Sequence, residues 1–489
     1  MNFEICHSPV SFLTSVLGTL PAELPLTAEE NWWRNEGMQI STAVDRGGTP
    51  WLKMFNSDGT RIDEILYPPE YWHMLRRGYQ AGSVWRAFEG SSLIPSFLLG
   101  YLTAFFDPGL YCPYTVSLST AVPLYKYGEP ETRERFLPYL LRKDVQVWQG
   151  ATWMTEVKGG SDLGMGVECL AQHTAKGWRL SGEKYFASNA GAELAIVAAR
   201  RAGAPQTVRG LSLFLVPRFR QNGSLNYTIR RLKDKTGTRS VPTGEVELQG
   251  SEAYLLGAEE EGIYLILEAL NLSRVANSIA SVALMQRAMA DAVEFAQRRV
   301  AFGKPIIEHP LLKRQFAARG LLLQECFALA WEAVRLLDQV WMETRPYSPK
   351  YHLFRLVAHL AKYYTAEQAV QTAKWAMEVY GGLGVLQEYG IERWLREAMI
   401  LPIWEGTPHR QMLDGIEVME RKQAHVMLFE HLSTFAEPQS LEAAAGEVET
   451  LLSLPAMEKE AEVEPVFNRL AKFTAETLRR RYPSLSAEK

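Results

Sequence analysis

The hydrophobic pattern of this 489-residue chain changes its period twice, and this change limits the folds that the chain can adopt. In the range 211–215 every second residue is leucine, an alternation that is typical of a β-strand. From Leu322 through Cys326 to Val340, apolar residues instead recur at spacings of four and three, which places them on one face of a helix. The chain is therefore predicted to adopt an α+β fold that is mainly helical.

These periods divide the chain into four regions. Residues 1–147 mix aromatic and aliphatic residues with scattered Pro and Gly, which indicates an N-terminal helical domain. Residues 148–256 carry the alternation and predict a central antiparallel β domain, and residues 257–424 predict a C-terminal helical bundle. Residues 425–489 lose aromatic residues and gain glutamate, which predicts a separate, exposed helical appendage.

Composition argues against several classes of protein. A net charge of -4 gives no broad attraction for nucleic acid or anionic lipid. The cysteines are too far apart for a zinc site or a redox motif, so no metal site is expected, and buried free thiols in a reducing compartment are predicted for Cys6, Cys112, Cys169 and Cys326. The first 20 residues lack a basic segment, and no stretch of about 18 apolar residues occurs. A soluble, cytoplasmic protein without membrane insertion is expected.

The common nucleotide and hydrolase motifs are missing from the sequence. It contains neither G-x-G-x-x-G nor G-x-x-x-x-G-K-[ST], so a nicotinamide enzyme or a P-loop ATPase loses support. H-E-x-x-H and G-x-S-x-G are also absent, so zinc hydrolysis and serine esterase chemistry have no sequence basis.

Three segments carry the strongest functional signal. Residues 154–162 (MTEVKGGSD) combine small residues, which permit close backbone approach, with hydroxyl donors. Residues 295–305 (FAQRRVAFGKP) read as a helix end followed by a turn, where Arg299 is able to grip a phosphate. The third segment contains Tyr-Gly-Gly at 380–382 and Ile-Trp-Glu-Gly-Thr at 403–407.

Glu405 is the candidate base of the third segment. The apolar run ILPIW leads directly into this carboxylate. Desolvation by an apolar wall destabilises the charged form, which moves the pKa towards neutrality and makes Glu405 a usable general base. A solvated glutamate at a helix start remains the alternative for this segment on its own.

In this order and at these separations, the three segments resemble the acyl-CoA dehydrogenase family. More narrowly, the ranges 231–235 and 112–113, together with the IWEG motif, look like the AidB branch, and the match extends from about residue 60 to about residue 420. The resemblance implies the acyl-CoA dehydrogenase fold, with an N-terminal helical domain, a central β domain and a C-terminal four-helix bundle.

The resemblance also implies FAD as the cofactor. Its implied contacts are Met154, Thr155, Gly160, Ser161, Phe186, Ser188, Arg299, Phe302, Glu378, Gly381, Gly382 and Thr407. Arg299 and Phe302 would reach the FAD of a neighbouring subunit, which implies a homo-oligomer, either a dimer or the tetramer that is usual in the family. Pro310 and Glu378 stand where many relatives carry Gln, so the adenine end of the cofactor would be held differently.

The implied reaction is acyl-CoA dehydrogenation in fatty acid metabolism. Glu405 would remove the α-proton of an acyl-CoA thioester while a β-hydride passes to flavin N5, giving a 2-enoyl-CoA. Ser161, Arg274 and Gly406 would contact the substrate, and an electron-transferring flavoprotein would accept the electrons. One branch of the family draws its base from the position that Ser273 occupies here, and a serine cannot serve as that base without help.

Two other functions remain open from the sequence. The first is an AidB-like flavoprotein that binds or protects DNA and has little dehydrogenase activity. Residues 421–489 contain nine Lys and Arg against eleven Asp and Glu, and the run at 479–481 reads as a solvated helix end, so DNA binding ranks below catalysis. The second is a flavin-dependent oxidase or monooxygenase on the same fold.

Overall fold

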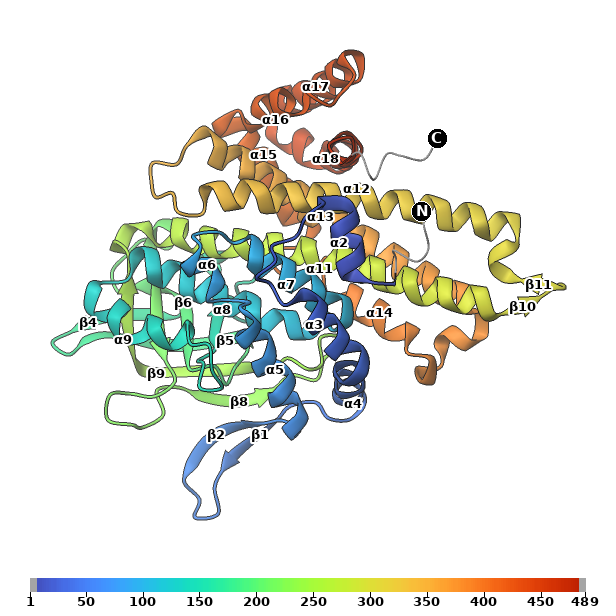
Figure 1. Cartoon of the computed structure of the whole chain (residues 1–489). Coiled ribbons are helices and arrows are strands. Elements are labelled where there is room, and N and C mark those ends of the chain that lie inside the picture. The colour runs from blue at the N-terminus through green and yellow to red at the C-terminus, as the bar shows by residue number, and fades with distance from the viewer. Residues whose placement is uncertain (1–6, 483–489) are drawn as a thin grey trace. The chain divides into compact units, whose positions relative to one another are not determined.

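The computed structural model describes residues 7–482 and divides the chain into two compact units, which are treated separately. The sheet unit consists of Trp33–Thr103 and Gly109–Ser273. The bundle unit consists of Met1–Trp32, Ala104–Pro108 and Arg274–Lys489. Helix α11 (Gly262–Arg298) begins in the sheet unit and continues into the bundle unit (Figure 1).

The first part of the sheet unit is helical, as the sequence predicts, apart from one hairpin. Its helices are η1 (Trp33–Gly37), α4 (Met38–Arg46), α5 (Pro69–Ala81), α6 (Arg86–Glu89), α7 (Ile94–Phe106), α8 (Pro108–Tyr127) and α9 (Pro130–Leu140). Strands β1 (Trp51–Phe55) and β2 (Arg61–Leu66) form an antiparallel hairpin that the sequence analysis missed. The polar turn Asn-Ser-Asp-Gly at 56–59 is the signal that could have revealed it.

The central sheet is mixed, which corrects the antiparallel prediction. Its strands are β3 (Gly150–Trp153), β4 (Leu170–Thr174), β5 (Gly177–Ser188), β6 (Leu194–Arg201), β7 (Leu211–Pro217), β8 (Thr228–Leu232) and β9 (Thr243–Leu256). Strand β6 pairs in parallel with β3 and β4, whereas the remaining pairings are antiparallel. Because β6 is a continuous buried apolar run, its sequence shows no face preference and gives no indication of strand direction.

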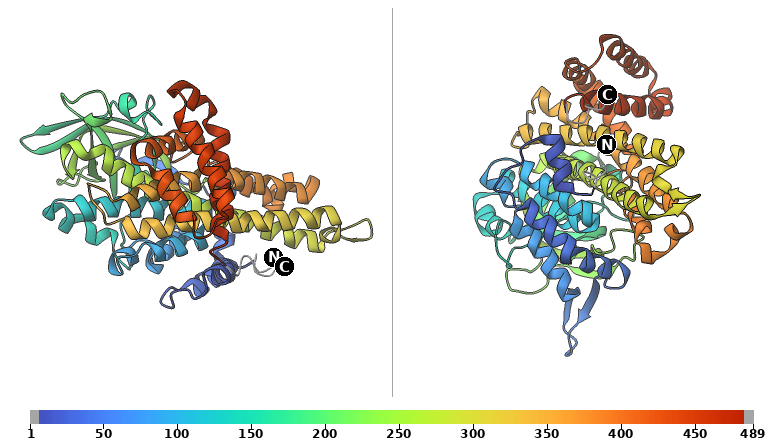
Figure 2. Two further views of the ribbon diagram at one scale, coloured as in Figure 1. Left: turned by 90° about the horizontal axis from the view of Figure 1, so that it is seen from above. Right: turned by 45° about the vertical axis from the view of Figure 1, so that its right-hand side comes forward.

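Long helices build the bundle unit. They are α2 (Pro9–Leu17), α3 (Leu26–Trp32), α12 (Pro310–Val340), α13 (Pro349–Tyr380), α14 (Ile391–Ala398), α15 (Pro408–Lys422), α16 (Ala424–Leu432), α17 (Pro438–Ser453) and α18 (Ala456–Arg479). Helices α12 and α13 pack against each other along their length (Figures 1 and 2). The predicted stripe on α12 is buried at Cys326, Leu329 and Val340, which is why this helix lies inside the bundle.

The C-terminal region is helical, as the sequence predicts, but its last helix, α18, is not separate from the bundle. Helix α18 packs on α12 and α13, and Figure 2 shows it in red beside α17. Phe467, Leu470 and Leu478 bury one face of α18 completely or nearly so. The sequence analysis missed this face because the exposed glutamates of α17 and α18 dominate the composition of the region.

The arginine run at the end of α18 takes part in internal ion pairs. Arg481 donates to both carboxylate oxygens of the buried Glu332, at 3.2 and 3.0 Å. Arg480 donates to Glu437 and to the carbonyl of Phe435. The run is therefore tied to the bundle and is not the freely solvated helix end that the sequence suggests.

Three further predictions concern the chain as a whole. No helix within residues 7–482 is long and apolar enough to cross a membrane. Across the same residues no cluster of His, Cys, Asp and Glu could hold a metal ion. Cys169 and Cys326 are buried free thiols and Cys112 is a half-buried one, whereas Cys6 lies outside the described residues.

Two glycine substitutions test the packing of α18 on α15. A methyl group at Gly415 would lie 2.5 Å from Cε2 of the buried Phe467, whereas one at Gly446 on α17 would meet nothing within 4 Å. Overpacking costs about 1–3 kcal/mol, whereas alanine is favoured over glycine in a helix by about 1 kcal/mol. Gly415→Ala is expected to lower the midpoint of thermal unfolding and Gly446→Ala to raise it. Equal effects of the two changes would contradict the packing.

Candidate active site

Glu405 lies in a turn between α14 and α15, in the bundle unit. Its backbone has φ of 56°, and the following Gly406 has φ of 96°. A side chain other than glycine at positive φ is strained, and such strain persists only where the surroundings enforce it. The residues around the Glu405 turn (402–407) supply that enforcement.

Three buried side chains from three helices hold the Glu405 turn by its carbonyls. Lys362 on α13 donates from Nζ to the carbonyls of Pro402 and Gly406, at 2.7 and 2.6 Å. Gln411 on α15 donates from Nε2 to the carbonyls of residues 405 and 406, at 3.0 and 2.9 Å. Arg274 on α11 donates from Nε to the carbonyl of residue 405 at 3.1 Å.

The carboxylate of Glu405 is only partly enclosed by the protein. The residue is half-buried, but its Oε2 is enclosed and has no hydrogen-bond partner among the described residues. Burial raises the pKa of Glu405 from 4.5 to about 7, although the positive charges of Arg274 and Lys362 oppose this rise. Burial likewise lowers the pKa of Lys362 from 10.5 to about 7. The site thus holds an acid and a base that both titrate near neutrality.

A second set of contacts fixes these donors. Asp414 accepts from Arg274 at 3.1 Å and also pairs with Arg410. His359 is fully buried, and its Nδ1 lies 2.9 Å from Oε1 of Gln411. Because the amide nitrogen of Gln411 donates to carbonyls, its Oε1 must accept, which assigns the imidazole proton to Nδ1. Burial lowers the pKa of His359 to about 3, so the ring is neutral at physiological pH.

The structure brings four of the predicted cofactor residues together in the sheet unit. Thr155 follows β3, and its carbonyl accepts from Tyr185 N at 2.9 Å, which sets the 154–155 backbone beside the end of β5. Ser188 ends β5, and its hydroxyl lies 3.1 Å from that of Thr243. Phe186, on the same strand, leaves 52% of its surface exposed. An exposed aromatic ring suits contact with a flat ligand.

A buried ion pair between Lys184 and Glu156 holds the backbone at Met154. Lys184 Nζ lies 2.5 Å from Glu156 Oε1 and also donates to the carbonyl of Met154 at 3.3 Å. The same carboxylate accepts from the backbone N–H of Cys169 at 3.2 Å. Gly160 and Ser161 lie in the exposed turn that follows, and a methyl group at Gly160 would meet nothing within 4 Å.

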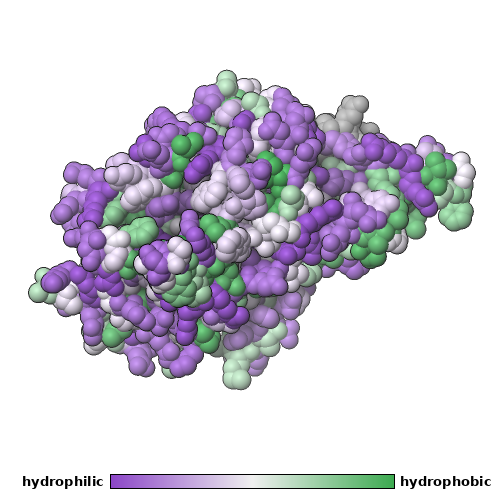
Figure 3. All heavy atoms as spheres, turned by 90° about the horizontal axis from the view of Figure 1, so that it is seen from below, coloured by the Kyte–Doolittle hydropathy of each residue, from purple (hydrophilic) through white to green (hydrophobic). Residues whose placement is uncertain are grey.

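Two predicted cofactor residues, Arg299 and Phe302, lie on an exposed end of the bundle unit. Arg299 precedes the hairpin of β10 (Val300–Ala301) and β11 (Lys304–Pro305), and Phe302 at its tip is 96% exposed (Figure 1). Apolar surface gathers on this extension (Figure 3). The exposed apolar residues there include Val300, Leu311 and Val385. Among the described residues of the bundle unit, these side chains at the end of the extension remain exposed.

The remaining predicted residues of the bundle unit lie near the ends of α13 and α15. Glu378, in the last turn of α13, forms an ion pair with Lys374. Gly381 ends α13 with φ of 60°, and a methyl group at Gly382 would meet nothing within 4 Å. Thr407 is the N-cap of α15. The 381–382 backbone is therefore open to a ligand.

Ser273, the alternative position for a base, is occupied by a hydrogen bond. Its hydroxyl lies 3.2 Å from that of Ser119, within the sheet unit, and both residues are buried. This hydrogen bond joins two hydroxyl groups and supplies no base that could activate Ser273, so the assignment of the base to Glu405 is favoured.

Sequence reasoning missed Lys362, His359, Gln411 and Asp414. A signal for two of them is present, because His359 and Lys362 interrupt the otherwise apolar run LVAHLAKYY on α13. A lysine at a buried helical position is rarely found without a specific partner. The partners of Lys362 are backbone carbonyls some 40 residues away in the chain. Contacts with backbone carbonyls leave no pattern of side chains in the sequence, so they could not be predicted.

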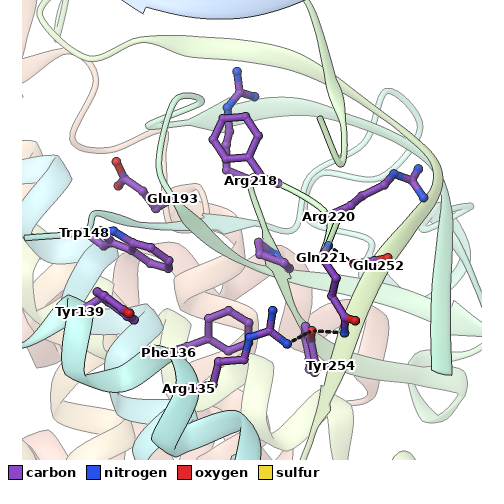
Figure 4. A pocket seen from close by; sticks show the side chains of 12 residues that line it. Arg135, Phe136, Tyr139, Trp148, Glu193, Arg218, Arg220, Gln221, Glu252 and Tyr254 are labelled. Carbon is purple, nitrogen blue, oxygen red and sulfur yellow. Dashed lines mark hydrogen bonds between the residues drawn. The ribbon is translucent and has the colours of Figure 1, made fainter. Parts of the chain in front are cut away.

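A hollow in the sheet unit is lined by none of the predicted site residues. It has a volume of about 490 Å³ (Figure 4). Tyr254 at its wall accepts from Arg135 at 3.1 Å and from Gln221 at 3.3 Å, and Arg220 donates to backbone carbonyls. Glu193 also lines the hollow; burial raises the pKa of its carboxyl group, and its Oε2 accepts from the backbone N–H of Gln149 at 2.7 Å.

Three segments of the chain match known families. Residues 30–145 match the adaptive response protein AidB N-terminal domain. Residues 151–251 match the acyl-CoA dehydrogenase middle domain, and residues 260–419 match the acyl-CoA dehydrogenase C-terminal domain. Together these matches span most of the chain.

Individual proteins are similar over most of their length. The putative acyl-CoA dehydrogenase AidB of Escherichia coli is 31% identical over 416 residues, which cover 80% of this chain and 74% of that protein. The apo-form of Bd2924 superimposes with a TM-score of 0.87 at 29% identity, covering 98% of this chain and 96% of the other. Caenorhabditis elegans ACDH-11 in complex with C11-CoA gives a TM-score of 0.83 at 25% identity, covering 98% and 88%.

The raised pKa of Glu405 can be measured directly. An infrared difference spectrum between wild type and Glu405→Gln isolates the band of this one carboxyl group. The protonated band is expected to disappear with a midpoint near pH 7, because burial disfavours the ionised form. A midpoint at the ordinary value of 4.5 would contradict the enclosed environment described for Oε2.

Proposed function

The chain belongs to the acyl-CoA dehydrogenase family, in its AidB-like branch, and from this premise we propose that it oxidises an acyl-CoA thioester with Glu405 as the base. The observation that carries the proposal is the Glu405 carboxylate itself, with an enclosed Oε2 and a pKa raised by burial to about 7. A base whose pKa lies near the working pH is ionised in a large fraction of the molecules and still binds a proton strongly enough to remove it from the substrate.

Membership in this family supports FAD as the cofactor. The exposed ring of Phe186, the hydroxyl of Ser188 and the open backbone at Gly160 fit a large flat ligand with a phosphate tail. We assign Met154, Thr155 and Ser161 to the same part of the site. When bound, FAD supplies the acceptor for the hydride that leaves the substrate.

The chemistry of Glu405 follows from its surroundings. The substrate proton lies on the carbon next to the thioester carbonyl, and Glu405 takes that proton onto its carboxylate. Removing it places negative charge on the carbonyl oxygen, which preorganised donors must stabilise. The cations Arg274 and Lys362 keep the field around the Glu405 turn positive, which favours this charge.

An acyl-CoA thioester is the proposed substrate class. The relative ACDH-11 is described in complex with C11-CoA, and it covers 98% of this chain. Gly406 is a proposed contact of the thioester, and Arg274 supports it through the adjoining carbonyl of Glu405.

A homo-oligomer is part of the proposal. Phe302 is 96% exposed at the tip of a hairpin, and Arg299 precedes it. In a monomer the exposed ring of Phe302 contributes no burial of apolar surface, whereas contact with a second copy of the chain would bury it. By family resemblance, Arg299 and Phe302 would complete the FAD site of that copy, and an electron-transferring flavoprotein would be the acceptor.

DNA binding is a weaker candidate. It would need arginines that are free to face phosphates. Arg480 and Arg481 are instead bonded to Glu437 and Glu332. Opening these contacts to reach DNA would remove one of the three partners of the buried Glu332, which also contacts His431 and Arg335.

Removing the base tests the proposed function. In the purified holoenzyme, Glu405→Gln is expected to slow anaerobic bleaching of the flavin by an acyl-CoA by about 100- to 10,000-fold, because a positioned base contributes about that much to the rate. The variant should still bind FAD.

Glu417→Gln is a matched control, since this glutamate lies on α15 and pairs with Arg421 at the surface. It should bleach at the wild-type rate. Wild-type protein that no acyl-CoA bleaches would contradict the proposal, as would Glu405→Gln that bleaches normally. Reoxidation by air or by an electron-transferring flavoprotein then separates an oxidase from a dehydrogenase.

A further inference from the structure

Lys362 is a buried cation that the proposed reaction does not use directly. Its side chain is fully buried. Its side-chain nitrogen donates to the backbone carbonyls of Pro402 and Gly406, which lie on either side of Glu405. It forms no ion pair within 4 Å in the part of the chain that the structure describes. Burial lowers the pKa of Lys362 to about 7, and the negative charge of Glu405 opposes this shift, so the ammonium form of Lys362 is favoured by the ionised form of Glu405.

The neighbouring charges leave Glu405 as the carboxylate that Lys362 faces. Arg274 and Arg410 both pair with Asp414, which uses that carboxylate. The other titratable group of this face of α13, His359, is neutral because burial lowers its pKa to about 3. Arg355, also on α13, adds a further positive charge near His359. Glu405 is thus the anion left to balance Lys362.

We propose that Lys362 is a positioning residue for Glu405, which ties down the carbonyls that flank the base and stabilises its ionised form by charge. This inference rests on the proposed function, because it concerns the same base. The two actions are separable. The carbonyl bonds act on the geometry of the Glu405 turn, and the charge acts on the protonation of its side chain.

Gln411 provides the comparison that separates them. It also donates to the carbonyls of Glu405 and Gly406, but it carries no charge. Loss of Gln411 should therefore loosen the turn without changing the charge near the base. Loss of Lys362 should do both.

Four variants of the FAD-loaded protein form the experiment: Lys362→Met, Lys362→Arg, Gln411→Met and Thr365→Val. Thr365 is the matched control, because it is fully buried on the same helix and its hydroxyl bonds only to the carbonyl of Ala361. Two readouts need no turnover. They are the infrared titration of the Glu405 carboxyl group and amide hydrogen exchange of the peptide that covers residues 400–410.

Lys362→Met is expected to move the midpoint of the Glu405 titration upward by about one pH unit or more, since a nearby positive charge favours the carboxylate. Exchange in residues 400–410 should become faster. Lys362→Arg, which keeps the charge, should leave the midpoint near that of wild type. Gln411→Met should speed exchange with little change of the midpoint, and Thr365→Val should change neither.

An unchanged or lowered midpoint in Lys362→Met would overturn the inference. If Lys362→Met does not fold, Lys362→Gln keeps a hydrogen-bond donor while removing the charge, and the same upward shift is required of it. The acid limb of kcat/KM for acyl-CoA should move with the infrared midpoint, with the rate recovering at high pH. If no acyl-CoA is oxidised at all, the proposed function fails, whereas the titration and exchange results still decide the role of Lys362.

Discussion

The site depends on one electrostatic constraint, which is that a carboxylate with an enclosed oxygen lies beside cations that do not form ion pairs with it. Burial alone would hold Glu405 protonated, and a direct ion pair would hold it ionised and inert. Arg274 is committed to Asp414, and Lys362 is committed to backbone carbonyls. Arg274 also donates to the backbone carbonyl of Glu405, and the charges of Arg274 and Lys362 oppose the effect of burial on the carboxyl group, whose pKa is raised to about 7.

Three helices of the bundle hold the Glu405 turn in place. The three donors that hold the Glu405 turn come from α11, α13 and α15, so the turn keeps its strained backbone only while these three helices are packed together. Asp414 and His359 then fix two of the donors. A shift of any one of these helices would therefore move a donor that holds the Glu405 turn and so change the position of the base.

The sequence predicts the periodic parts of this protein well and its non-local parts poorly. The stripe on α12 and the order of helical and β regions follow from local periods, and IWEG marks Glu405 because the apolar run precedes it directly. The parallel pairings of β6, the buried face of α18 and the bonds from Lys362 depend on residues far apart in the chain. The domain boundaries and cofactor contacts stay predictions, as does the transfer of family roles to single residues.

The most direct test of the central claim is α-proton exchange on an acyl-CoA that has no β-hydrogen. Such a thioester cannot lose a hydride, so the incorporation of solvent deuterium at its α-carbon, followed by mass spectrometry, reports the base alone. The account predicts exchange that rises with pH through about 7 in the FAD-loaded wild type and is lost in Glu405→Gln. Equal exchange in the two proteins would contradict it.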